Sequence, residues 1–276
     1  MSRAIIALFV FICIGLGLPA AEPNPVKVSI AQHLQNTSVT IKAGPYSGSG
    51  SLVQTKDGRV WAWTAAHVVK VLRKTKEGED KKIKVEFDDA QILRFNRDKD
   101  TGRIVSSFNS DAEIIRYSDP EEGFDLCLLR IRDKGFKPAG STQFYLDKDA
   151  PELGTELYHV GSLLGTFGSN SMTSGIMSQH GRLIEGKLYD QVTCTCRSGS
   201  SGGIVCLKSD GRYVGMLVMS AGEGFGLMVP VRVMSKWAKD TGIEFAVDNA
   251  KEVPTDDILL KDGLERTSVK SIKDGK

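Results

Sequence analysis

Residues 196–205 combine three serine hydroxyls with three glycines, a composition suited to nucleophilic chemistry. We call this stretch the serine loop. The flanking residues 191–195 and 204–207 are β-branched or apolar, so the loop is expected to join two strands. A hydroxyl attacks a carbonyl efficiently only when a base takes its proton and N–H groups stabilise the oxyanion. One glycine-rich turn can supply both the hydroxyl and the donors. The alternative is a flexible loop without chemistry, which such composition often means.

A base for this hydroxyl must come from elsewhere in the chain, and His67 is the best of the four histidines. It closes a strand-like run directly after small residues, which leave room for another side chain to approach. The carboxylate that orients such a base should be buried. Asp125 stands between Phe124 and Leu126 at the start of an apolar run, where an unpaired charge is costly. The alternatives are a structural histidine and a turn aspartate.

Many short strand-like segments at close spacing indicate an all-β fold. Two hairpins are expected, one turning at Asp57-Gly58 and one at Asp210-Gly211, because Asp-Gly between strand-like runs is a strong turn signal. The second hairpin echoes the first, as two similar β-barrels in tandem would. A short C-terminal helix is expected at residues 234–241, before Gly242. Other strands are expected at residues 26–42, 83–87, 104–108, 112–117, 124–131, 156–161, 171–178 and 226–231.

The first 21 residues have the three parts of a secretory signal peptide. A positively charged start precedes an apolar run over residues 4–18, and small residues follow at positions 20 and 21. Such a run is short for a membrane span, which needs about 20 residues. No later stretch is apolar enough to span a bilayer. The mature chain is therefore expected to be secreted or periplasmic, with an uncleaved membrane anchor as the alternative.

Cleavage after residue 20 or 21 would leave four cysteines in a compartment that permits disulfides, namely Cys127, Cys194, Cys196 and Cys206. A bridge between Cys206 and either Cys194 or Cys196 is conceivable because these residues flank the serine loop. Buried free thiols are the alternative, and no pairing can be assigned from the sequence.

The balance of charges favours no charged partner. The chain has 36 Lys and Arg residues against 34 Asp and Glu residues, a net charge of +2, so we expect no nucleic-acid partner. No metal or cofactor is expected. Residues 246–276 are charged and poor in aromatic side chains, which indicates a largely mobile tail.

Three motifs in the order His, Asp, Ser resemble those of chymotrypsin-like serine proteases: Thr64-Ala65-Ala66-His67, Asp125-Leu126-Cys127-Leu128-Leu129 and Gly199-Ser200-Ser201-Gly202-Gly203. Within that superfamily they are most similar to high-temperature-requirement proteases and related trypsin-like peptidases. Residues 48–53, 160–178 and 226–230 support the resemblance, which spans residues 40–231. The 31 residues from Ala246 are too short for the peptide-binding domain that many of these proteases carry, so none is expected.

The resemblance implies two tandem antiparallel β-barrels, residues 22–140 and 141–245, with the site in the cleft between them. His67 would be the general base, Asp125 its orienting partner and Ser201 the nucleophile. Ser201 is preferred to Ser198 and Ser200 because it precedes Gly-Gly, as the family nucleophile does. The backbone N–H groups of Gly199 and Ser201 would form the oxyanion hole.

The resemblance also implies which residues bind the substrate. Thr195, six residues before the nucleophile, would lie at the floor of the primary specificity pocket, with Val218, Met219 and Ser220 as its wall. A shift of one residue would place Cys194 or Cys196 at the floor instead. Because none of these supplies a carboxylate, we expect apolar side chains of small to medium size.

Two residues depart from the family pattern. Ser200 stands where Asp or Asn is usual, and Ile204 stands where Pro is usual. Neither change removes a catalytic group. The expected function is therefore an exported serine endopeptidase that cleaves polypeptides through an acyl-enzyme. The alternative is a secreted binding or scaffold protein that keeps the fold without turnover.

Overall fold

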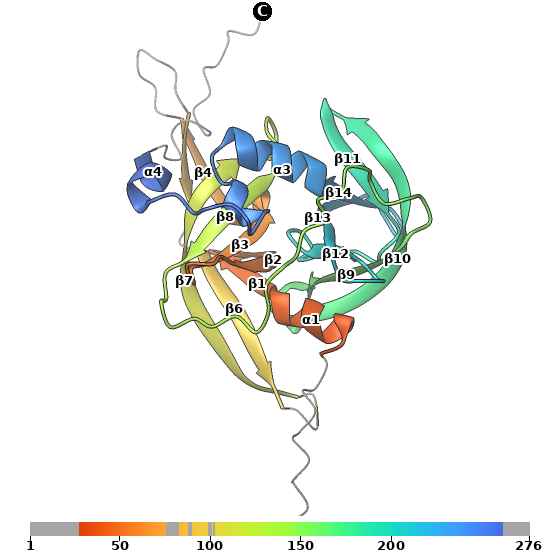
Figure 1. The fold of residues 1–276 in the computed structure, drawn as a ribbon, viewed down its shortest axis with the longest axis horizontal. Helices are drawn as coiled ribbons and strands as arrows, with labels where there is room; N and C mark the ends of the chain where they lie inside the picture. Colours follow the sequence, from red (N-terminus) through yellow and green to blue (C-terminus); the bar gives the residue numbers. More distant parts are fainter. Residues whose placement is uncertain (1–27, 76–82, 88–89, 99–100, 102, 262–276) are drawn as a thin grey trace, which may run out of the picture.

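The strands of this protein form two closed antiparallel barrels, with order β1-β2-β3-β8-β7-β6 in the first and β10-β11-β14-β13-β12-β9 in the second. The computed structural model describes residues 28–75, 83–87, 90–98, 101 and 103–261 (Figure 1). In Figure 1 the first barrel runs from orange to yellow-green and the second from green to blue, and the two lie side by side. The predicted all-β double barrel is confirmed.

The first barrel consists of β1 (Ser38–Ala43), β2 (Tyr46–Gln54), β3 (Val60–Ala65), β6 (Ala90–Arg97), β7 (Ile104–Ser118) and β8 (Leu126–Ile131). The second consists of β9 (Glu156–Leu163), β10 (Gly168–Ile184), β11 (Lys187–Val192), β12 (Ile204–Leu207), β13 (Tyr213–Ser220) and β14 (Gly226–Pro230). A separate two-stranded sheet joins β4 (Lys70–Thr75) to β5 (Ile83–Phe87).

The two Asp-Gly turns form the hairpins whose strands lead to His67 and away from the serine loop. Gly58 has a φ of 85° and Gly211 a φ of 78°, a region that suits glycine, and each donates its N–H across the turn. The first turn returns the chain as β3, which ends immediately before Ala66 and His67. The second hairpin begins with β12, which immediately follows Gly203 of the serine loop.

The chain after the second barrel returns to the first barrel and packs on β3. Helix α3 (Val231–Asp240) begins three residues before the predicted helix and ends before Gly242. Its Trp237 ring lies 5.9 Å from the Trp63 ring. In the following 3₁₀ turn η2 (Glu244–Ala246), the C=O of Ala246 accepts a 2.8 Å hydrogen bond from the Trp63 indole. This packing supports β3, the strand that leads to His67.

Part of the predicted mobile tail, residues 246–261, is described by the structure, and its mobility stays a prediction. Helix α4 (Asp256–Lys261) packs on the first barrel, with Leu259 buried. Asp256 accepts hydrogen bonds from Arg59 at 3.1 Å and from Arg130 at 2.8 Å. One of the charges that indicated a solvated tail, Asp256, therefore pairs with two arginines of the first barrel. Residues 262–276 lie outside the described residues.

The N-terminal expectation of a strand over residues 26–42 is wrong in part. Helix α1 (Ile30–Thr37) precedes β1, and the Ser29 hydroxyl caps it by accepting a 3.2 Å hydrogen bond from the Gln32 N–H. Leu34 is buried on the inner face of the helix. The serine cap, rather than the apolar spacing, was the informative signal.

The predicted signal peptide lies outside the described residues. None of the helices in the part of the chain that the structure describes has the length and apolar character needed to cross a bilayer.

Candidate active site

His67 and Asp125 meet at one end of the first barrel. His67 lies in the single turn α2 (Ala66–Val69) after β3, and Asp125 immediately precedes β8. Because Ala65 pairs with Leu126 between these strands, the two side chains come together. Asp125 Oδ2 lies 2.7 Å from His67 Nδ1, and Oδ1 accepts a 2.9 Å hydrogen bond from the His67 N–H.

This arrangement fixes the orientation of the imidazole. The Asp125 residue is only 6% exposed, so the histidine rather than water is the partner of its carboxylate. Asp125 has a φ of 58°, a conformation that Asp tolerates better than most residues. A carboxylate at Nδ1 favours the tautomer with hydrogen on that atom, which leaves Nε2 as the proton acceptor.

The serine loop presents two N–H groups from alternate peptides. The C=O of Ser198 accepts a 2.7 Å hydrogen bond from Leu164, and the C=O of Ser200 accepts a 2.9 Å hydrogen bond from Gly203. In a trans peptide the C=O and the following N–H point in opposite directions. The N–H groups of Gly199 and Ser201 therefore point away from these partners. Among the described residues, neither N–H donates a hydrogen bond.

The serine loop belongs to the second barrel but contacts the strands that lead to His67. The C=O of Ser201 accepts a 2.7 Å hydrogen bond from Ser49 of β2. A Cβ at Gly202 would collide with Thr64 and Ala65, so the loop backbone lies directly against the end of β3. The Ser201 hydroxyl itself lies 3.4 Å from the Val218 C=O. No hydrogen bond joins it to His67 in the described part of the chain.

The predicted substrate-binding residues differ in their burial and in their hydrogen bonds. Val218 ends the buried part of β13 and its C=O faces the Ser201 hydroxyl, whereas Met219 and Ser220 are exposed. Thr195 is half-buried, and its C=O accepts a 3.1 Å hydrogen bond from Thr173.

Cys196, the alternative floor residue, lies against the strand pair that carries Ser220. A Cβ at Gly226 would lie 2.9 Å from the Cys196 Sγ, and Gly226 pairs with Ser220 between β14 and β13. These contacts bring Cys196 next to the predicted wall. Sequence spacing alone could not separate it from Thr195.

The four cysteines in the described residues are buried free thiols, which is one of the two alternatives that the sequence left open. Burial raises the pKa of Cys194 to about 12 and that of Cys196 to about 11. It also holds the pKa of Cys127 and of Cys206 well above the usual range. These thiols therefore stay neutral at physiological pH.

The His159 ring packs against the backbone of the serine loop, a role that the sequence did not reveal. Its ring is fully buried, and Nδ1 lies 3.0 Å from the Ile204 C=O. A Cβ at Gly203 would collide with the ring, so the loop backbone rests on it. Burial lowers the pKa of His159 to about 4, against a smaller opposing effect of the Ile204 hydrogen bond. His159 is therefore a neutral support.

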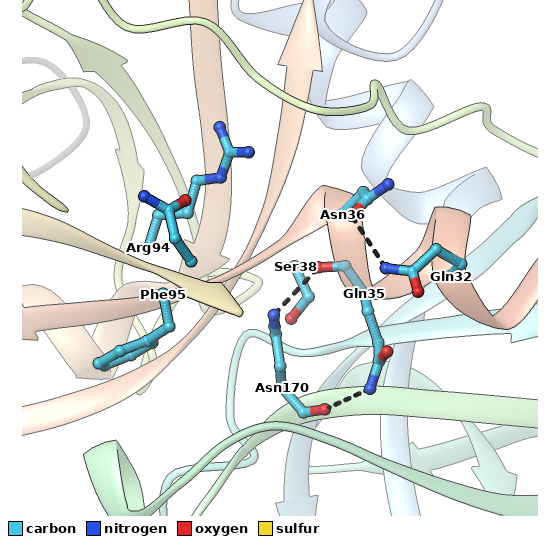
Figure 2. Close-up of a pocket in the computed structure, with 8 residues that line it drawn as sticks. Gln32, Gln35, Asn36, Ser38, Arg94, Phe95 and Asn170 are labelled. Carbon is cyan, nitrogen blue, oxygen red and sulfur yellow. Dashed lines mark hydrogen bonds between the residues drawn. The ribbon is translucent and has the colours of Figure 1, made fainter. Parts of the chain in front are cut away.

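A polar pocket of about 300 Å³ lies between α1, β6 and β10, and Figure 2 shows its side chains. Gln35 and Asn170 exchange two hydrogen bonds there, at 3.0 and 3.1 Å, which tie α1 to the second barrel. None of the residues that line this pocket belongs to the predicted site. In the described parts of the chain, no group of three His, Cys, Asp or Glu residues is arranged to hold a metal ion.

Comparisons with known proteins agree with this architecture. A family model described as "Trypsin-like peptidase domain" matches residues 48–216, which contain His67, Asp125 and Ser201. A search of curated proteins found no match.

Two solved structures share the fold. A serine endoprotease from Yersinia pestis superimposes with a TM-score of 0.55 at 19% identity, over 78% of this chain and 66% of that chain. The inactive form of a serine-to-alanine mutant of Rv3671c from Mycobacterium tuberculosis superimposes with a TM-score of 0.54 at 17% identity. That match covers 81% of this chain and 96% of the other.

The buried His159 predicts a specific pH dependence of stability. Its pKa is about 4 in the folded protein and about 6.5 when unfolded, so the unfolded state binds more protons between these values. Stability is therefore lost as the pH falls from about 6.5 to about 4. Chemical denaturation at pH 7.5 and pH 5 should show a loss from this group of about 2 kcal/mol.

His159→Gln should show a correspondingly smaller difference between the two pH values, because the other titrating groups are unchanged. Should the variant fail to fold, NMR titration of the native ring gives the same information. A His159 ring that protonates near pH 6.5 in the folded protein would contradict the account.

Proposed function

Since this chain belongs to the trypsin-like peptidase domain family, we propose that it is a serine endopeptidase acting through an acyl-enzyme on Ser201. The observation that carries the proposal is the position of the His67–Asp125 pair. It lies at the end of β3, against which the serine loop rests with two free N–H groups. These are the elements that acyl transfer requires.

In the proposed reaction, Ser201 Oγ forms a bond to the carbonyl carbon of the substrate while its proton passes to His67 Nε2. Asp125 stabilises the imidazolium that results. The substrate oxygen takes up negative charge and is stabilised by the N–H groups of Gly199 and Ser201. His67 then gives its proton to the leaving amine as the C–N bond breaks. Water, activated by the same histidine, hydrolyses the acyl-enzyme.

This reaction requires the Ser201 hydroxyl to turn from the Val218 C=O toward His67. The contact with Val218 is long, at 3.4 Å, so little energy opposes the rotation. Catalytic hydrogen bonds commonly tighten only when substrate is bound.

The proposed enzyme needs no charged partner for Ser200. The Ser200 hydroxyl accepts a 3.1 Å hydrogen bond from the Arg197 N–H, and its own N–H donates to the Arg197 C=O at 2.9 Å. The serine loop is therefore closed on itself without an ion pair to a new N-terminus. We infer an exported protease that is active without removal of any segment beyond the signal peptide.

The first prediction from this proposal concerns the nucleophile. Ser201→Ala should lower turnover by roughly 10⁴-fold, because the triad acts as a unit. Ser200→Ala is the matched control in the same loop and should cost less than about tenfold, since it loses one local hydrogen bond. The measurement is peptide hydrolysis, together with labelling by a fluorophosphonate probe and mass spectrometry of the modified residue.

Labelling of Ser200 instead of Ser201 would overturn the nucleophile assignment. Folded wild-type protein that neither hydrolyses peptides nor reacts with the probe would favour the scaffold function.

The second prediction concerns the residue that precedes the cleaved bond. Neither Thr195 nor the neutral thiols of Cys194 and Cys196 provides a negative charge, so a Lys or Arg side chain would be desolvated without a counter-charge. A burial gain of about 0.8 kcal/mol per methylene favours Val, Ala, Leu and Met.

A peptide library randomised at this position should show those four residues enriched. Cleavage mainly after Lys or Arg would contradict the assignment of Thr195, Val218, Met219 and Ser220 to the specificity pocket.

A further inference from the structure

We propose that Ser49 is a positioning residue that holds the oxyanion hole from the opposite barrel, an inference that rests on the proposed function. Ser49 lies in β2 and is completely buried. It touches neither His67 nor Asp125 through any hydrogen bond in the described residues. Its N–H, its hydroxyl and its C=O nevertheless all form hydrogen bonds to the serine loop or to the strand beside it.

Ser49 donates hydrogen bonds to two carbonyl groups of the serine loop. Its N–H donates a 2.7 Å hydrogen bond to the Ser201 C=O, and its hydroxyl donates a 2.7 Å hydrogen bond to the Gly199 C=O. The same hydroxyl accepts a 2.7 Å hydrogen bond from the Ser162 N–H. The C=O of Ser49 accepts a 2.8 Å hydrogen bond from the Thr64 hydroxyl, which anchors it to β3.

Along the loop, the carbonyls held by Ser49 alternate with carbonyls held by residues that follow the first barrel in the chain. Leu164 and Gly203 hold the carbonyls of Ser198 and Ser200, whereas Ser49 holds those of Gly199 and Ser201. Four successive peptides of the loop are thus fixed by hydrogen bonds. Their alternation sets the direction of the two free N–H groups.

The Ser49 hydroxyl has its largest effect on the backbone conformation of Gly199. This residue has a φ of 89°, and glycine has little intrinsic preference that would keep it there. The Ser198–Gly199 peptide is held by Leu164 and the Gly199–Ser200 peptide by the Ser49 hydroxyl. Fixing both peptides fixes φ and ψ at the residue between them. Without the Ser49 hydroxyl, the Gly199–Ser200 peptide keeps only the 2.9 Å hydrogen bond from its Ser200 N–H to the Arg197 C=O. The Gly199 N–H is then held less firmly in its direction relative to the Ser201 N–H.

The expected consequence is a loss of transition-state stabilisation. Removing an oxyanion-hole donor outright costs roughly 10²–10³ in kcat. Ser49→Ala leaves the donor present but less well oriented, so we expect kcat to fall by roughly 10–100-fold with KM nearly unchanged.

Ser51→Ala is the matched control. Ser51 is also completely buried in β2, two residues further along, and its hydroxyl makes no hydrogen bond to the serine loop in the described residues. Because this hydroxyl has no hydrogen-bond partner among the described residues, Ser51→Ala should leave kcat unchanged. Both variants are compared with wild type in kcat, KM and melting temperature, and in their affinity for a peptidyl boronate and for the matching unreactive peptide amide.

The inference predicts that Ser49→Ala weakens boronate binding in parallel with kcat/KM while its affinity for the peptide amide is unchanged. If the wild type is active and Ser49→Ala is equally active, the role of Ser49 is overturned and the proposed function stays intact. Equal losses in both variants, or equal losses for boronate and amide, would show a purely structural role. A wild type without turnover would instead overturn the proposed function and this inference together.

Discussion

The geometry of the serine loop depends above all on hydrogen bonds to its carbonyl groups. The carbonyls of residues 198–201 accept hydrogen bonds from Leu164, Ser49 and Gly203, so the loop is held from both barrels. Because each trans peptide directs its N–H away from its carbonyl, these bonds leave the N–H groups of Gly199 and Ser201 facing outward. The glycines permit this backbone path, and the hydrogen bonds select it.

The rest of the fold maintains the junction at which these bonds form. The chain that leaves the second barrel packs Trp237 against Trp63 of β3, and the Ala246 C=O binds the Trp63 indole. Strand β3 in turn carries Thr64, which anchors Ser49, and ends before His67. On the N-terminal side, Gln35 of α1 and Asn170 of β10 join the two barrels. These contacts therefore tie the two halves of the protein together at two further places.

The sequence predicted the fold and suggested the side chains of the candidate site, but not the contacts that orient them. Asp125 was recognisable because a carboxylate between apolar residues needs a partner, and the structure supplies His67. The two Asp-Gly hairpins were recognisable because their turn chemistry is local. Helix α1 was missed because an alternating apolar pattern outweighed the serine cap at Ser29. The packed part of the tail was missed because its anchors are backbone carbonyls and distant arginines, which leave no local pattern.

The central claim is that the serine loop holds a formed oxyanion hole beside the His67–Asp125 pair. A crystal structure of the protein with a peptidyl boronate tests it most directly, because the boronate mimics the tetrahedral intermediate. We predict a bond from boron to Ser201 Oγ, with one boronate oxygen within about 3.2 Å of the Gly199 and Ser201 nitrogens. A boronate bound to another serine, or an oxygen directed away from both N–H groups, would contradict the claim.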